Sequence, residues 1–253
     1  DGSQALNCTT VRSTPIKGQY LVVPRNNNGV YNPALTLVPP FSIETWIQFA
    51  STNAASRTIV SEGKVPVTCG TDPANLFQGW AGFALGQYQD YLYFTCCATN
   101  AFSKTSELDT SGYNKWQGFK AGQVVHVVAT FDGTTESIYT NGALCVSKNV
   151  SPNAAGLTYV PDTTSPIMIG DGSVLPTTAG QQPFSGGLDE VAIYTNLLQL
   201  SDVQAHYAAA SSGYAAAVQA SNPLRYYRVD DGVSASGSVY DRASYPVAAN
   251  SGS

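Results

Sequence analysis

Residues 183–207 read PFSGGLDEVAIYTNLLQLSDVQAHY, and this stretch decides the fold class. Within it, Leu188, Val191 and Ile193 stand among polar or small residues directly after a Gly-Gly bend. This pattern predicts a β-strand that runs to Tyr194. The residues that follow predict a short helix. A strand that leads into a small helix, late in a chain rich in strand patterns, indicates the closing edge of an all-β domain.

The predicted helix has a start signal and one apolar face. Ser201 is placed to cap its N-terminus, and Asp202 lies in its first turn. Leu200, Val203 and Tyr207 recur at helical spacing and therefore fall on one face of the helix.

The composition favours many short strands over helices. Only 11% of the 253 residues are charged, whereas Gly (23) and Pro (14) are frequent and Tyr (15) is the main aromatic residue. Exposed helix faces need Glu and Lys, so this balance disfavours a helical protein. The length fits one β-sandwich domain over residues 1–253, with its core at 19–207 and a C-terminal tail at 211–253.

Charge and hydropathy argue against two kinds of partner. The formal net charge is −5 and the basic residues form no stripe, which argues against nucleic acid. No apolar run approaches the roughly 20 residues of a membrane-spanning helix, so membrane insertion is not expected.

The cysteines and the first residue favour an extracellular setting. The chain begins at Asp1 rather than Met, as a mature secreted protein or a trimmed chain would. The five cysteines lack zinc-type spacing, which predicts two disulfides and one odd thiol in an oxidising compartment. Adjacent cysteines in a strand point to opposite faces and need different partners. The disulfide candidates are Cys8, Cys69, Cys96, Cys97 and Cys145, and the glycosylation candidates, which match Asn-X-Ser/Thr, are Asn7 and Asn149.

Three polar or aromatic residues in strand patterns invite a functional reading. Phe41, Ile43 and Thr45 alternate with Ser42, Glu44 and Trp46. A strand tryptophan is usually part of the core and Glu44 has no nearby carboxylate partner, so both are predicted to be structural. His126 lies in an apolar strand with no nucleophile signature beside it. A buried, hydrogen-bonded histidine is therefore favoured over a catalytic one.

The chain resembles a known family at three places. These are GLDEVAIY with LLQLSDVQAHY, then YLVVP with FSIETWI, and the strand GQVVHVVATF before an Asp-Gly turn. They are similar to the laminin G-like domains of the concanavalin A-like jelly-roll superfamily, although Val124 stands where that family usually has Trp. The resemblance implies a sandwich of two antiparallel sheets with one short helix near the C-terminal end. It also implies a structural calcium held by Asp189 with help from Asp241, for which a salt bridge or a turn-capping role of Asp189 is the alternative.

The tail shows the main departure from this family. Residues 214–231 and 237–241 resemble a segment that precedes the first strand in family members. Either the tail completes its own sandwich, or it leaves an edge open and completes a neighbouring copy.

The acidic residues do not form a glycosidase pattern. Glu107 and Asp109 are followed by no third acid at the required spacing. Asp189 and Glu190 are adjacent, so a regular strand would direct them to opposite faces. No catalytic residue is predicted.

Residues 98–120 form a polar and aromatic segment that is expected to be a loop. Phe102, Tyr113 and Trp116, with Phe119 beside them, are candidates for a glycan platform, because sugars stack on aromatic rings. The alternative is that these rings fold back onto the sheet.

The sequence thus favours a secreted, non-enzymatic structural or adhesion subunit of a filament, cell surface or virion, which contacts copies of itself through its termini. The main rival is a glycan-binding, lectin-like module. A third hypothesis is a non-catalytic domain of a larger hydrolase. The fold itself does not choose among them, because it hosts many functions.

Overall fold

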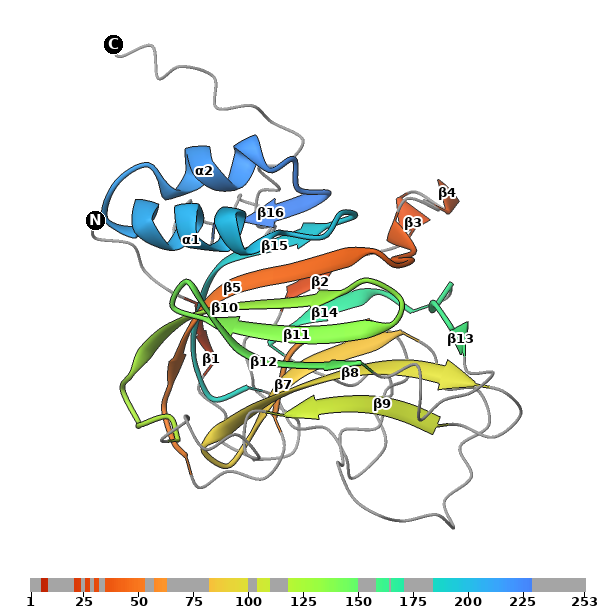
Figure 1. The fold of residues 1–253 in the computed structure, drawn as a ribbon, viewed down its shortest axis with the longest axis horizontal. Coiled ribbons are helices and arrows are strands. Elements are labelled where there is room, and N and C mark those ends of the chain that lie inside the picture. Colours follow the sequence, from red (N-terminus) through yellow and green to blue (C-terminus); the bar gives the residue numbers. More distant parts are fainter. Residues whose placement is uncertain are drawn as a thin grey trace.

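Two antiparallel β-sheets stack face to face, and two short helices cover the outer side of one of them (Figure 1). This computed structural model describes residues 6–8, 21–23, 26–27, 30–31, 35–52, 57–62, 82–99, 104–109, 118–149, 158–163, 165–170 and 184–228. The two-sheet arrangement confirms the predicted all-β jelly-roll sandwich.

The first sheet has strand β5 near its centre. Its order is β1-β15-β5-β10-β11-β12, and β16 pairs with β15. The bounds are Leu6–Cys8 (β1), Gly186–Tyr194 (β15), Phe41–Phe49 (β5), Val124–Phe131 (β10), Thr135–Thr140 (β11), Ala143–Asn149 (β12) and Arg225–Tyr227 (β16). Strand β5 pairs along most of its length with both β10 and β15.

The second sheet has the order β13-β8-β7-β6-β14-β2, with β9 paired to β8. The bounds are Thr158–Tyr159 (β13), Tyr91–Thr99 (β8), Phe83–Tyr88 (β7), Arg57–Glu62 (β6), Ile167–Ile169 (β14), Leu21–Val23 (β2) and Lys104–Asp109 (β9). A separate two-stranded pair joins Asn26–Asn27 (β3) to Val30–Tyr31 (β4).

The residues of β5 face two different cores. Phe41, Ile43 and Ile47 are buried between the sheets, where the Phe41 ring lies 5.3 Å from that of Phe83. Glu44 and Trp46 lie on the opposite face and contact the helical layer, because side chains alternate along a strand. The predicted alternation is confirmed.

The helical layer begins with Leu200–Ala208 (α1), continues through a short 3-10 turn and ends with Tyr214–Ala220 (α2). The predicted cap is wrong: the N-cap residue is Gln199, whose backbone N–H donates to the Asp202 carboxylate at 2.8 Å, and Ser201 lies inside the helix. No described helix is long and apolar enough to cross a membrane.

The face of α1 that packs on the sheet also differs from the prediction. Val203 and His206 are buried, whereas Leu200 and Tyr207 are partly exposed. The apolar spacing missed this face because His206, a polar residue, occupies one of its central positions.

The described part of the tail folds back on its own chain. Strand β16 pairs with β15, placing Tyr226 opposite Ala192, and α2 packs over the same sheet. As far as Arg228, the tail therefore follows the first of the two arrangements considered, in which it completes the sheet of its own chain. Asp241 and the end of the tail lie outside the described residues.

Two further segments test the sequence reading. The Asn141-Gly142 turn joins β11 to β12 with positive φ angles at both residues (50° and 80°), as a type I′ turn requires. Within the expected loop of residues 98–120, residues 104–109 instead form β9. Phe119 is buried, with its ring 4.5 Å from that of Phe49.

Candidate functional site

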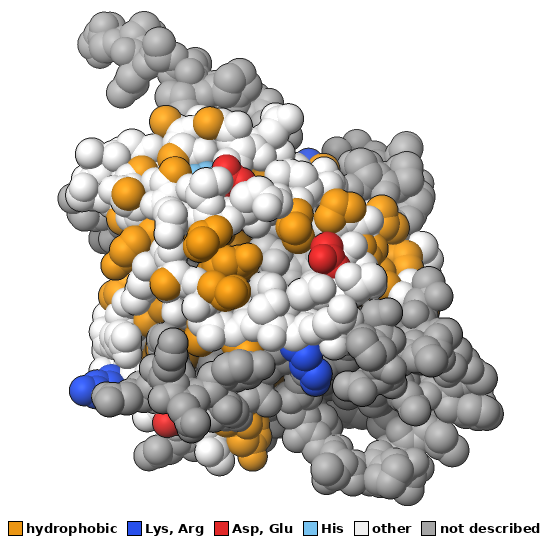
Figure 2. Space-filling view, in the orientation of Figure 1, with side chains coloured by type: hydrophobic (Ala, Val, Ile, Leu, Met, Phe, Trp, Pro, Cys, Tyr) orange, Lys and Arg blue, Asp and Glu red, His pale blue; other side chains and the backbone are white. Residues whose placement is uncertain are grey.

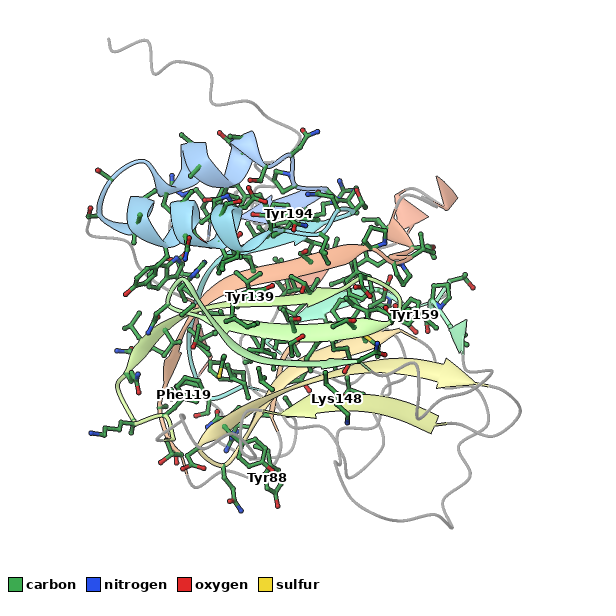
Figure 3. All side chains as sticks on the ribbon, in the orientation of Figure 1. Tyr88, Phe119, Tyr139, Lys148, Tyr159 and Tyr194 are labelled. Carbon is green, nitrogen blue, oxygen red and sulfur yellow. The ribbon has the colours of Figure 1, made fainter. Side chains whose placement is uncertain are left out.

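A buried carboxylate on β5 joins the first sheet to the helices. The Glu44 side chain is fully buried and is surrounded by hydrogen-bonding side chains from four other elements. These are His126 Nε2 (2.7 Å), His206 Nδ1 (3.0 Å), Tyr214 Oη (2.8 Å) and Tyr194 Oη (2.5 Å). The label of Tyr194 in Figure 3 marks this layer, between β15 and the helices.

Burial would raise the pKa of Glu44, but hydrogen bonds and charge interactions with His126 and His206 outweigh it and lower the pKa to about 2. Burial has the opposite effect on His206, yet its contacts with Glu44 raise the pKa of the imidazole above its ordinary 6.5. Glu44 is therefore held ionised by its partners. A buried charge satisfied from all sides is typical of a structural group.

A β-bulge in β15 brings two further acids to the outer face of this sheet. The register shifts between Asp189 and Ala192, and Glu190 has a left-handed backbone with φ of 53°. The Glu190 N–H donates to Asp189 Oδ1 at 2.8 Å. Because the bulge inserts an extra residue, Asp189 and Glu190 border the same pocket, and the prediction that they point to opposite faces is wrong.

Both carboxylate oxygens of Glu190 accept hydrogen bonds. The hydroxyl of Tyr226 donates to Oε2, and Nε of Arg228 donates to Oε1 at 3.1 Å. Burial is the largest influence on the pKa of this carboxyl and raises it. Tyr226 and Arg228 lower the pKa and the nearby Asp189 raises it, and together these effects place the pKa at about 7.

The two acids form one wall of a pocket of about 530 Å³. The pocket lies on the outer face of the first sheet, next to the turn between the helices. Its other side chains include Trp46, Gln48, Val124, Ser211 and Tyr214. The volume is within the range of small-molecule sites, about 300–1,000 Å³.

The pocket opens beside a partly exposed aromatic group. Trp46 is half-buried, with its ring 5.9 Å from Tyr214 at 70° and 5.9 Å from Tyr207 in a stacked arrangement. Val124, at the pocket, is 54% exposed. Figure 2 shows apolar side chains spread over one face of the molecule, with Lys and Arg side chains mostly low in the view, away from the helices.

Residues 18–204 match the Laminin_G_3 family, described as the concanavalin A-like lectin/glucanases superfamily. The chain belongs to this superfamily. The resemblance noted at the three sequence motifs is thereby confirmed. No curated protein matches the chain.

Several solved structures resemble this one at low sequence identity. A candidate carbohydrate-binding protein from Bacteroides ovatus ATCC 8483 has a TM-score of 0.54 and 17% identity, over 88% of this chain and 52% of its own. The CBM40 of the Ruminococcus gnavus IT-sialidase, bound to α2,3 sialyllactose, has a TM-score of 0.47 and 16% identity, over 67% of this chain and 82% of its own. The present chain thus spans about half the length of the Bacteroides protein. At 17% identity, the likeness to the Bacteroides protein shows the fold alone.

The structure accounts for only some of the predicted site residues. Asp189 borders the pocket, but Asp241, the other calcium candidate, lies outside the described residues, as do Phe102, Tyr113 and Trp116. The calcium site and the glycan platform therefore remain predictions. Among the described residues, no group of three or more His, Cys, Asp or Glu is arranged to hold a metal ion.

The cysteine predictions also remain largely open. Cys145 is a free, half-buried thiol, and burial raises its pKa. Cys96 is buried in the core between the sheets. The side chains of Cys8 and Cys97, and all of Cys69, lie outside the description. Of the two glycosylation candidates, Asn149 is exposed at the end of β12, whereas Asn7 is described only as part of β1.

The predictions for the strand residues of the first sheet are better resolved. His126 is buried and hydrogen-bonded, and Glu44 is part of the scaffold, as predicted. Trp46 is structural, as predicted, because it packs on the helices, but it also borders the pocket. The sequence reading missed Glu190, His206 and Tyr214. Glu44 and Trp46 are two residues apart in a strand and so share one face of the sheet. This pairing of a carboxylate with a large aromatic ring could have indicated that a second, partly polar core covers that face.

Proposed function

We propose that this superfamily member is a non-catalytic carbohydrate-binding module whose ligand occupies the pocket on the outer face of the first sheet. The observation that carries the proposal is the combination of aromatic and hydrogen-bonding walls. Trp46 and Tyr214 offer surfaces on which the C–H face of a sugar can pack. Asp189 and Gln48 offer oxygen and amide groups for its hydroxyls.

Hydrogen bonds that hold two of the pocket's side chains in place support this function. Tyr214 is fixed by its hydrogen bond to Glu44, and Glu190 is held by Tyr226 and Arg228. A site held in shape before binding loses little conformational freedom when its ligand arrives.

Catalysis has less support than binding. Asp189 and Glu190 lie side by side, which alone would be compatible with acid and base work. However, both oxygens of Glu190 already accept hydrogen bonds from Tyr226 and Arg228. These contacts favour a fixed wall over a group that transfers protons in a reaction.

Assembly through the termini is a second proposal, with weaker support. Donation of the tail to a neighbouring copy would need it to leave its own sheet, whereas β16 pairs with β15 of the same chain. An extracellular location suits either function and remains a prediction.

A pair of neighbouring substitutions tests the carbohydrate site. Ser211 is exposed at the pocket, and Ser212 is exposed next to it but is not a lining residue. We expect Ser211→Trp to fill the pocket and to abolish binding to the array glycans that the wild-type protein binds. Ser212→Trp adds the same ring and should bind as the wild type does. Equal binding by both variants would refute the assignment to this pocket, and the absence of any glycan binding by the wild type would refute the function.

A further inference from the structure

The pocket adjoins an exposed tyrosine that is not among the described residues lining it. Tyr207, near the end of α1, is 39% exposed, and about one helical turn separates it from the pocket residue Ser211. We infer that the site takes a chain of linked sugars, with one unit in the pocket and another on the outer face of Tyr207, in place of a single terminal sugar. This inference rests on the proposed carbohydrate-binding function and names the ligand class of that site.

One face of the Tyr207 ring rests on the sheet. Its centroid lies 5.9 Å from that of Trp46 and 5.9 Å from that of His126, at interplanar angles of 22° and 24°. Trp46 and His126 are cross-strand partners on β5 and β10, with ring centroids 5.0 Å apart. Because these two stacked neighbours are so close to each other, both lie on the same side of Tyr207. The opposite face is therefore turned outward, as a flat surface on which the C–H face of a sugar can pack.

The hairpin between β11 and β12 holds the edge of this ring. A Cβ built on Gly142 would lie 3.0 Å from Cδ1 and 3.2 Å from Cβ of Tyr207, so the hairpin backbone approaches the ring closely. Tyr207 is thus fixed by the sheet beneath it and by the hairpin beside it. A ring that is fixed before binding loses little conformational freedom when a sugar packs on it.

Trp46 connects the pocket to Tyr207, because it borders the pocket and also stacks under the Tyr207 ring. Val124, which is 54% exposed, borders the pocket on the neighbouring strand, two residues before His126 and therefore on the same face. The side chains of Trp46, Val124 and Ser211 are uncharged. A chain that leaves the pocket on this side meets apolar surface and a serine hydroxyl, which suits the C–H faces and hydroxyls of linked sugars.

Tyr207 also shields the side chain of His126, which is fully buried. If shielding were its only role, binding at the pocket would not depend on the length of the glycan. If Tyr207 holds a second sugar unit, affinity depends on whether the ligand is long enough to reach it. Glycan length is therefore the variable that separates the two roles.

The test measures affinity for saccharides of one to four units by NMR titration of the full chain, in the cello-, manno-, xylo- and chito-oligosaccharide series. We expect affinity to rise about two- to tenfold when the second or third unit is added, which is the size of one aromatic contact. Tyr207→Leu keeps an apolar side chain over His126 but removes the ring. It should abolish this rise and leave the affinity for the single sugar unchanged. Tyr207→Phe keeps the ring and should keep the rise.

Leu200→Ala is the matched control, because Leu200 is also exposed on α1 but lies about two turns from Tyr207. Its dependence on glycan length should equal that of the wild type. If Tyr207→Leu does not fold, the Tyr207 ring resonances of the wild type supply a second measurement. They should shift when the longer saccharides are added and stay in place when the single sugar is added.

The outcomes separate this inference from the function on which it rests. Equal affinity for one and four units, a length dependence that Tyr207→Leu leaves unchanged, or Tyr207 ring resonances that no longer saccharide shifts would overturn the chain-binding inference and leave a pocket for a single sugar in place. Failure of every saccharide to bind the wild type, in these series and on the array, would overturn the proposed function and this inference together.

Discussion

Replacing Glu44 by Gln should remove the charge that holds the helices on the sheet. Ionised Glu44 accepts hydrogen bonds from two histidines and two tyrosines, and its pKa is lowered from 4.5 to about 2. At about 1.4 kcal/mol per pKa unit, this shift corresponds to roughly 3 kcal/mol of folding free energy. Breaking a buried charge pair by removing one partner typically costs about 3–5 kcal/mol, so the two estimates agree. We expect Glu44→Gln to lower the free energy of unfolding by about 3 kcal/mol near pH 6.

The pH dependence gives this prediction a specific signature. A carboxyl whose pKa is lowered by folding stabilises the protein fully above its unfolded pKa, and this contribution disappears as pH falls through the folded pKa. The wild type should therefore lose its advantage over Glu44→Gln between pH 4.5 and about 2. Urea unfolding followed by far-UV circular dichroism, repeated at several pH values, measures the difference.

Tyr214→Phe is a graded control, because it removes a single donor to Glu44 and keeps the ring. Its cost should be about 1 kcal/mol. A difference between Glu44→Gln and wild type below about 1 kcal/mol near pH 6 would refute the reasoning. So would a larger difference that stays constant down to the acid limit.

Three other predictions concern the hairpin, the tail and calcium. Gly142→Ala should destabilise the protein by about 1 kcal/mol or more in thermal unfolding, because φ is 80° there and an added Cβ would lie 3.0 Å from the Tyr207 ring; an unchanged melting temperature would contradict this contact. A chain ending at Ser211 loses α2 and β16 and should be unfolded by circular dichroism, while light scattering finds the full chain monomeric; a folded truncated monomer beside an oligomeric full chain would instead support assembly through the tail. If Asp189 and Asp241 hold calcium, a chelator should lower the melting temperature, and identical melting curves would remove that site.

The sandwich was predictable because its signals are local. The alternation in β5, the Asn-Gly turn and the strand before α1 each follow from neighbouring residues, and all three are present. The helical layer was harder to predict. His206 and Tyr214 face a core whose central group is a carboxylate 162 and 170 residues earlier in the chain, so hydropathy alone assigned the wrong face to α1.

The pocket could not be predicted from the sequence for a different reason. It depends on a bulge, and the sequence shows no Gly or Asn at the residue that adopts the left-handed backbone. Glu190 takes that conformation in a structure where its carboxylate accepts a hydrogen bond from Tyr226 in β16, more than 30 residues later. A regular strand was the correct local expectation, and a long-range contact overrode it.

The two-sided character of β5 constrains how this protein can evolve. Gain or loss of one residue in the middle of the strand would turn every following side chain to the other face. The Phe and Ile side chains of the inner core would then exchange places with Glu44 and Trp46, and both cores would fail together. Lineages of this domain should therefore vary in β5 by substitution alone, and differences in chain length should be confined to its connecting segments.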